Sequence, residues 1–180
     1  MRRLLLFISL VAVTSPLFGE VRLDELTATE KDGKVSVLFR LGGVFEDEEI
    51  AKKLKGGLPT VFAFEVQLVR KRHNWFDKTL ASRWIEVAAT FNSLTREYLL
   101  NYRRDEKLVF SETYRDFEKL TVAMTRIEEN DLFDTPPGRL EGHRVRVRSE
   151  VRSELVFYLV PRRVGTGWRT CHIDPAEGDS

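Results

Sequence analysis

An apolar alternation over residues 58–70 constrains the fold of this chain more than any other feature. Every second residue from Phe62 to Leu68 is apolar, so an extended strand places these side chains on one face. A strand of this length is long for a globular protein. Two further strand-like runs follow at 80–91 and 95–103. Three long consecutive strands predict an antiparallel meander on which the rest of the chain packs.

Strand patterns also flank this meander. Residues 21–30 and 35–41 lie on either side of an Asp-Gly pair, which is a strong signal for a tight hairpin turn. The first of these two strands is less regular, and we expect it at a sheet edge. Residues 143–152 alternate between mostly valines and mostly arginines, a pattern that suits only a strand. Residues 155–160 are its expected partner.

Two short helices are predicted among the strands. Over 45–55, acidic residues crowd the start and lysines crowd the end, which is the charge order that a helix dipole favours. A metal site is the alternative explanation of the acidic cluster, and the dipole accounts for it more simply. Over 112–126, apolar residues recur at helical spacing. A Pro-Pro-Gly loop follows at 136–138.

These elements predict an all-β fold with two short accessory helices. The architecture is an antiparallel β-sandwich, or a partly open barrel, of about eight strands. With 180 residues the chain suits one domain with its own core. We expect a single β-sandwich domain over 20–165 and a loosely ordered C-terminal tail over 166–180. The predicted core comprises Val37, Phe39, Leu41, Phe62, Phe64, Val66, Leu68, Tyr98, Leu100, Phe117, Val145, Val147 and Phe157.

The first residues are typical of a secretory signal peptide. Two arginines precede an apolar run over 4–13, and a helix breaker and Gly19 follow. The expected signal peptide is 1–19, which implies a periplasmic or otherwise extracytoplasmic protein with no transmembrane span after cleavage. Cys171 is the only cysteine, so an intramolecular disulfide and a metal site built on cysteines are both excluded.

The most distinctive candidate surface is a row of arginines on one face of the 143–152 strand: Arg144, Arg146, Arg148 and Arg152. Together they would bind a polyanion, such as lipid phosphates or an acidic patch of a partner protein. Arginine is also a common outward residue on strands, where its stem covers apolar surface and its charge blunts edge pairing. This second interpretation is favoured. No nucleic-acid partner is expected, because an exported protein rarely meets one.

A second candidate surface is the turn that contains His73 and Trp75. Trp75 and Phe76 form either an exposed contact patch or a plug that closes the sandwich end, and the plug is favoured.

Cys171 and His172 are the only pair that resembles a nucleophile and its base. Adjacent residues on an extended chain point in opposite directions, so we expect no catalysis there, and no cofactor or metal.

The central stretch carries several short features in a characteristic order. They are Gly57-Leu58-Pro59, the strand Phe62–Leu68 ending in Arg70, then Arg72, Trp75 and Asp77, and Leu94-Thr95-Arg96-Glu97-Tyr98. In their order and spacing they resemble a family catalogued as domain of unknown function 4390, whose members are bacterial exported proteins. The resemblance covers residues 21–131 and depends on no single decisive motif. It implies a small, mostly β domain outside the cytoplasm and provides no catalytic residues.

The functional expectation is a non-enzymatic envelope protein that acts as a protein-interaction module. Its partner would be another envelope protein, bound through the arginine face or the Trp75 loop. The alternative is a carrier of a lipid or other apolar ligand inside the β-sandwich. Aromatic residues make up 11% of the chain, which suits a carrier, but the same side chains would fill an ordinary core.

Overall fold

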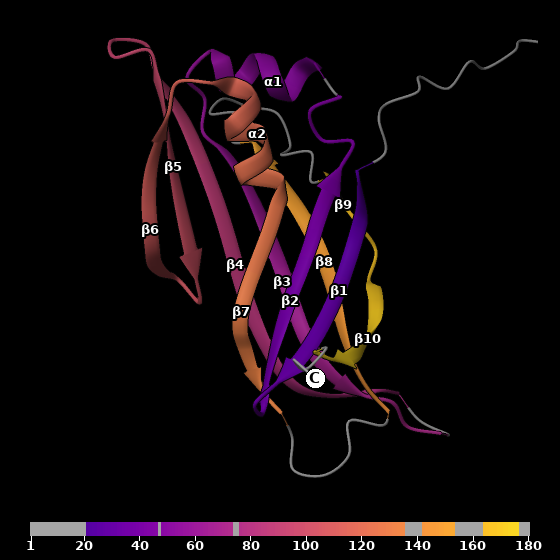
Figure 1. Ribbon diagram of the computed structural model, residues 1–180. Coiled ribbons are helices and arrows are strands. Elements are labelled where there is room, and N and C mark those ends of the chain that lie inside the picture. Colours follow the sequence, from indigo (N-terminus) through magenta and orange to yellow (C-terminus); the bar gives the residue numbers. More distant parts are fainter. Residues whose placement is uncertain (1–20, 47, 74–75, 136–141, 154–163, 177–180) are drawn as a thin grey trace, which may run out of the picture.

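The computed structural model describes residues 21–46, 48–73, 76–135, 142–153 and 164–176. These residues form ten strands and two helices, so the fold is mainly β, as predicted (Figure 1). The described residues do not include the expected signal peptide, the loop at 136–138 or the strand expected over 155–160.

Strands account for most of the elements. They are β1 (Arg22–Lys31), β2 (Lys34–Gly42), β3 (Thr60–Arg70), β4 (Lys78–Asn92), β5 (Glu97–Arg104), β6 (Lys107–Tyr114), β7 (Arg126–Asp134), β8 (His143–Ser153), β9 (Val164–Gly165) and β10 (Arg169–Pro175). The helices are α1 (Glu48–Lys55) and α2 (Phe117–Thr125).

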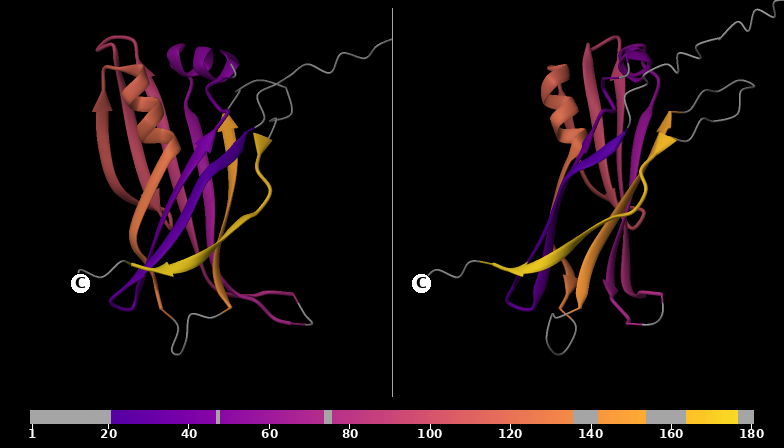
Figure 2. Two further views of the ribbon diagram at one scale, coloured as in Figure 1. Left: turned by 45° about the vertical axis from the view of Figure 1, so that its right-hand side comes forward. Right: turned by 90° about the vertical axis from the view of Figure 1, so that its right-hand side faces the viewer.

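All ten strands belong to one sheet. Its order is β6-β5-β4-β3-β8-β10-β1-β2-β7, and β9 pairs with β8 beside this path. Only β1 and β10 run parallel among the described pairs; the others are antiparallel. The sheet curls into a half-barrel, which realises the partly open barrel of the sequence prediction (Figure 2). Helices α1 and α2 lie at one end of it.

Strand β10 occupies the middle of the sheet. It pairs antiparallel with β8, where Cys171 faces Val145, and parallel with β1, where Ile173 faces Ala28. It thereby joins a five-stranded antiparallel part, β6 to β8, to the three strands β1, β2 and β7. The prediction of a loosely ordered tail over 166–180 is wrong for this segment. Since one side of β1 is covered by β10, its predicted place at a sheet edge is wrong as well.

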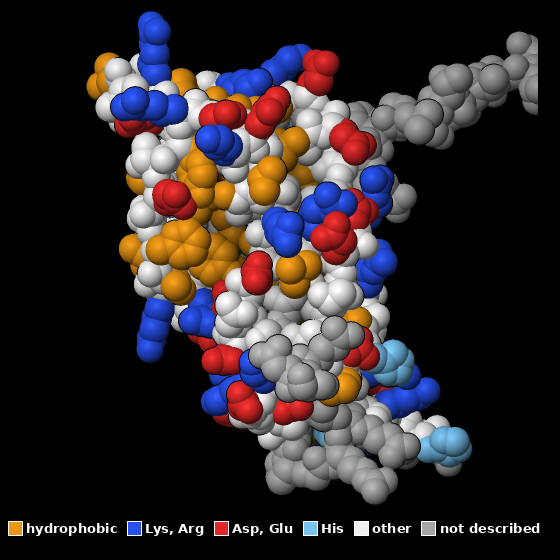
Figure 3. Space-filling view, viewed as in Figure 1, with side chains coloured by type: hydrophobic (Ala, Val, Ile, Leu, Met, Phe, Trp, Pro, Cys, Tyr) orange, Lys and Arg blue, Asp and Glu red, His pale blue; other side chains and the backbone are white. Residues whose placement is uncertain are grey.

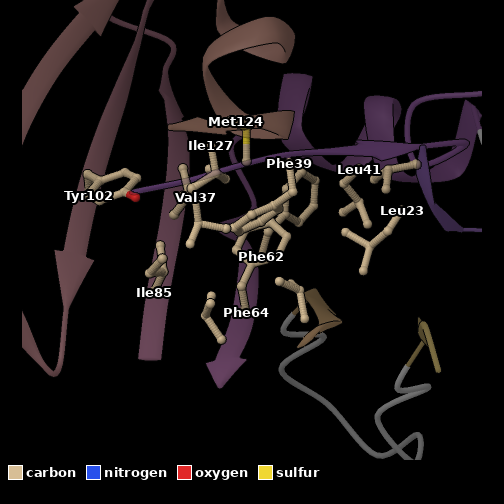
Figure 4. Close-up of a cluster of buried hydrophobic side chains, with 14 of the residues drawn as sticks. Leu23, Val37, Phe39, Leu41, Phe62, Phe64, Ile85, Tyr102, Met124 and Ile127 are labelled. Carbon is tan, nitrogen blue, oxygen red and sulfur yellow. The ribbon is translucent and has the colours of Figure 1, made fainter. Parts of the chain in front are cut away.

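The core fills the concave side of the sheet (Figure 4). The rings of Phe39 on β2 and Phe64 on β3 meet edge to face at a centroid distance of 5.0 Å. Phe62 contacts Phe45, which in turn contacts Phe117 of α2. Every predicted core residue that the structure describes is buried except Phe117, which is half-buried. Phe157 lies outside the described residues.

Charge and capping position the two helices. In α1, Glu48 and Glu49 pair with Lys52 and Lys53 one turn later, as their charge order predicts, and the buried Leu54 faces the core. Helix α2 is shorter than predicted. Its N-cap is Asp116, whose side chain accepts a hydrogen bond from the Glu118 backbone N–H. Residues on either side of α2 belong instead to β6 and β7, and β7 was not predicted.

Candidate functional site

Three of the four predicted surface arginines are bonded within the molecule, and two of them, Arg146 and Arg148, bind buried polar residues. Arg146 donates from Nε and Nη2 to Oε1 of Gln67, at 2.8 and 2.7 Å. Arg148 forms an ion pair with Glu65, with 2.5 Å between Nη2 and Oε2. Gln67 and Glu65 are both buried on the convex face of β3, although each is polar. The two arginines therefore satisfy polar groups that the sheet would otherwise leave without partners.

Trp168 strengthens this arrangement. Its ring lies 4.5 Å from Cζ of Arg146 and 4.8 Å from Cζ of Arg148, within the range of cation–π attraction. Because Trp168 immediately precedes β10, these contacts hold the C-terminal segment on the sheet. Of the remaining predicted residues, Arg152 pairs with Glu150 at 3.1 Å and Arg144 is half-buried. Much of the predicted arginine surface thus has an intramolecular role.

Two hollows flank Trp84 on the convex face. One has a volume of about 210 Å³ and the other about 450 Å³, and Ala63 lines both. The smaller hollow is bordered by Arg103 and Arg152, and the larger by Arg148. Glutamates also line both hollows, so the surface carries no single charge that would select a ligand.

An exposed apolar run lies on strand β6, at one end of the sheet. Leu108, Val109 and Phe110 are 58%, 48% and 45% exposed, and we call these three residues the β6 edge patch. Figure 3 shows apolar side chains gathered on this side of the molecule. Strand β6 pairs only with β5 among the described strands, so its outer backbone groups are open to a further strand. The sequence prediction missed this patch, although three consecutive apolar residues are visible there.

A polar cluster lies beneath the patch and links β5, which is next to one end of the sheet, with β7 at the other end. The ring of Phe110 stacks on Tyr102 of β5 at a centroid distance of 4.9 Å. The Tyr102 hydroxyl donates to Oε1 of Glu129 on β7, at 2.5 Å, and Arg104 pairs with Oε2 of the same carboxylate at 2.7 Å. Burial, and then the hydrogen bond to Glu129, raise the pKa of Tyr102. Glu129 itself is buried.

In the turn between β3 and β4, the described aromatic residue does not close the end of the fold. Phe76 is 90% exposed, so the predicted plug is wrong for this residue. His73 is also exposed. Trp75 lies outside the described residues.

Cys171 and His172 face opposite sides of β10, as expected. Cys171 packs against the core, and burial raises the pKa of its thiol to about 11, whereas His172 is exposed. A thiol with this pKa is a poor nucleophile near neutral pH. No cluster of three potential metal ligands occurs among the described residues. Likewise, neither described helix is long and apolar enough to cross a membrane.

Comparison with models of known protein families shows to which family the chain belongs. Residues 19–157 match the family described as domain of unknown function (DUF4390). The chain belongs to this family. Neither curated proteins nor solved structures match it. Strands β9 and β10 lie beyond the part of this DUF4390 protein that matches the family.

Proposed function

We propose that this DUF4390 protein is a non-enzymatic protein-interaction module of the bacterial envelope, exported to the periplasm or another extracytoplasmic compartment. The observation that supports it best is the β6 edge patch. An extended segment of another envelope protein would add to β6 as a further strand. Main-chain hydrogen bonds would provide affinity in such a complex, and alternate side chains would provide specificity.

The physical argument depends on how exposed strand edges are normally protected. Proteins usually blunt such edges with charges, bulges or a covering element. Strand β6 has a lysine at its start and a register shift beside Phe110, yet the apolar residues between them remain exposed. Exposed runs of three or more apolar residues are rare unless they serve a function. Binding of a partner would remove this surface from water.

The alternative, a carrier of an apolar ligand, has less support. Its ligand would occupy the interior of the half-barrel. There the large side chains of Phe39, Phe62 and Phe64 are fully buried and pack into one continuous cluster with their neighbours. Because these aromatics fill the space between the facing parts of the sheet, we favour the interaction module.

Site-specific crosslinking in the native host tests the proposal. A photoreactive residue at Val109 should form a discrete adduct with another envelope protein. A second substitution, Leu108→Lys, should reduce this adduct at least about fivefold, because an edge lysine opposes strand addition and costs on the order of 1 kcal/mol.

Val122→Lys is the matched control. Val122 is 59% exposed, nearly the same as Leu108, but it lies on α2 and not on a strand edge. The adduct should survive this change. Equal loss with both lysine variants, or persistence of the adduct in Leu108→Lys, would show that the β6 edge is not the binding surface.

A further inference from the structure

The base of the β3–β4 hairpin concentrates positive charge. Arg70, Lys71, Arg72 and Lys78 are all exposed, and Asp77 is the only acidic residue in the described part of this turn. Four basic residues and one acidic residue give a local charge of +3, whereas the whole chain has a formal charge of only +1. The hairpin therefore differs in charge from the rest of the molecule.

We call Arg70, Lys71, Arg72 and Lys78 the basic collar, and an exposed aromatic side chain lies among them. Phe76 is 90% exposed and lies in the sequence between Arg72 and Lys78. Figures 1 and 2 show β3 and β4 extending at the end of the molecule opposite to α1 and α2. The Lys71 backbone N–H donates to the carbonyl oxygen of Gly142 at 2.8 Å, which ties the hairpin base to the start of β8. This end is therefore held in place while its side chains point to solvent.

The collar also has few intramolecular partners. None of the ion pairs among the described residues involves Arg70, Lys71, Arg72 or Lys78. This distinguishes them from Arg146 and Arg148, which are bonded to Gln67 and Glu65. The charge at the hairpin is available to an external anionic surface.

We propose that this end of the β3–β4 hairpin docks on an anionic lipid surface. The Phe76 ring enters the interfacial region, and the basic side chains of the collar pair with lipid phosphates. Aromatic and basic side chains together provide the two signals, apolar and electrostatic, that peripheral membrane binding requires. The hairpin and the β6 edge patch lie on different parts of the molecule, so the proposal does not depend on the proposed function.

If the protein docks in this way, its partitioning to vesicles should depend strongly on lipid charge and on salt concentration. Each basic residue near an anionic surface strengthens binding roughly fivefold, and the effect decreases within a Debye length. Partitioning should therefore increase with the fraction of anionic lipid and decrease at high salt. Neutral vesicles should bind the protein weakly.

Vesicle co-sedimentation of the full-length protein tests this. The probes are vesicles of phosphatidylglycerol and phosphatidylcholine in equal parts, and vesicles of phosphatidylcholine alone. Reversing the charge of Lys71 and Arg72 together, Lys71→Glu with Arg72→Glu, should weaken partitioning to the mixed vesicles roughly twentyfold or more. Phe76→Ser should weaken it severalfold. All variants share the same N-terminal residues, whose contribution cancels in the comparison.

Leu94→Ser is the control for Phe76→Ser. Leu94 is 93% exposed in the turn at the other end of β4, so it matches Phe76 in exposure but lacks a comparable collar. Leu94→Ser should leave partitioning unchanged, and all variants should unfold at the same temperature. The proposal is overturned if binding is independent of phosphatidylglycerol, if the double reversal has no effect, or if Leu94→Ser weakens binding as much as Phe76→Ser.

Discussion

Glu129 brings a carboxylate into the interior of the half-barrel, where it is 6% exposed. A buried carboxylate is costly unless hydrogen bonds and opposite charge compensate it. Both come from β5, through the Tyr102 hydroxyl and the Arg104 guanidinium. Since Glu129 belongs to β7, this small cluster connects the strand next to one end of the sheet with the strand at the other end, and no backbone pairing joins these two strands.

Tyr102→Phe should destabilise the protein by about 2 kcal/mol, because it removes a hydrogen bond to a buried charged group. Urea unfolding measures the change. Tyr114→Phe is the matched control: its hydroxyl donates to Glu112 at 2.6 Å, but that pair is exposed. Its cost should be below about 0.5 kcal/mol. Similar losses from the two variants would contradict a special role for the buried cluster.

Cys171 should react slowly with iodoacetamide. With a thiol pKa of about 11, against an ordinary value of 9.0, the thiolate fraction at pH 8 falls to roughly one in a thousand. Alkylation should be about a hundredfold slower than in urea-unfolded protein and should accelerate about tenfold per pH unit between 8 and 10. Mass spectrometry of timed samples gives the rate. Equal rates in folded and unfolded protein would show that the thiol is not protected.

At the scale of elements, strands with regular alternation could be predicted from the sequence. In β3 and β8, apolar residues occupy every second position because one face packs on the core. Strand β7 lacks this signal. Its inner face begins with Ile127 and continues with the buried Glu129, and a positive φ at Asp131 then interrupts the alternation. A polar residue in a core position thus concealed the strand.

Strand β10 could not be predicted for a different reason. Only Ile173 is buried in it, so its sequence has no apolar periodicity to detect. Its position is determined by pairing with β8 and β1, which are distant in the chain. The β6 edge patch could not be predicted for the opposite reason. Its apolar residues are visible in the sequence, but their exposure follows from the place of β6 at the end of the sheet.

At the scale of the whole molecule, the described sheet consists of two antiparallel parts that β10 joins. The sandwich and partly open barrel predicted from the sequence are closely related in this respect, since two facing sheets become a half-barrel when one strand bridges them. Within the described sheet, the path from the five-stranded part to β1 passes through β10. The integrity of the fold therefore depends on seven residues near the C-terminus.

Ending the chain after Trp168 should abolish cooperative thermal unfolding, because β1 and β8 would each expose an unpaired edge and promote aggregation. Circular dichroism and light scattering measure the two effects. Ending the chain after Ala176 keeps β10 and is the control. A smaller change, Ile173→Ala, should lower the free energy of unfolding by about 2 kcal/mol. Cooperative unfolding of the protein that lacks β10 would contradict its bridging role.

The pairing of Ala28 with Ile173 also determines when the sheet can be completed during synthesis. Among the described strands, β1 is synthesised first and β10 last, yet the two are neighbours in the sheet. Closing so long a loop is slow compared with forming a hairpin. During synthesis, the edges of β1 and β8 that pair with β10 therefore remain unpaired until β10 has been made. A chain with this topology completes its sheet only after β10 has been made, and its vulnerability to misassembly is greatest until then.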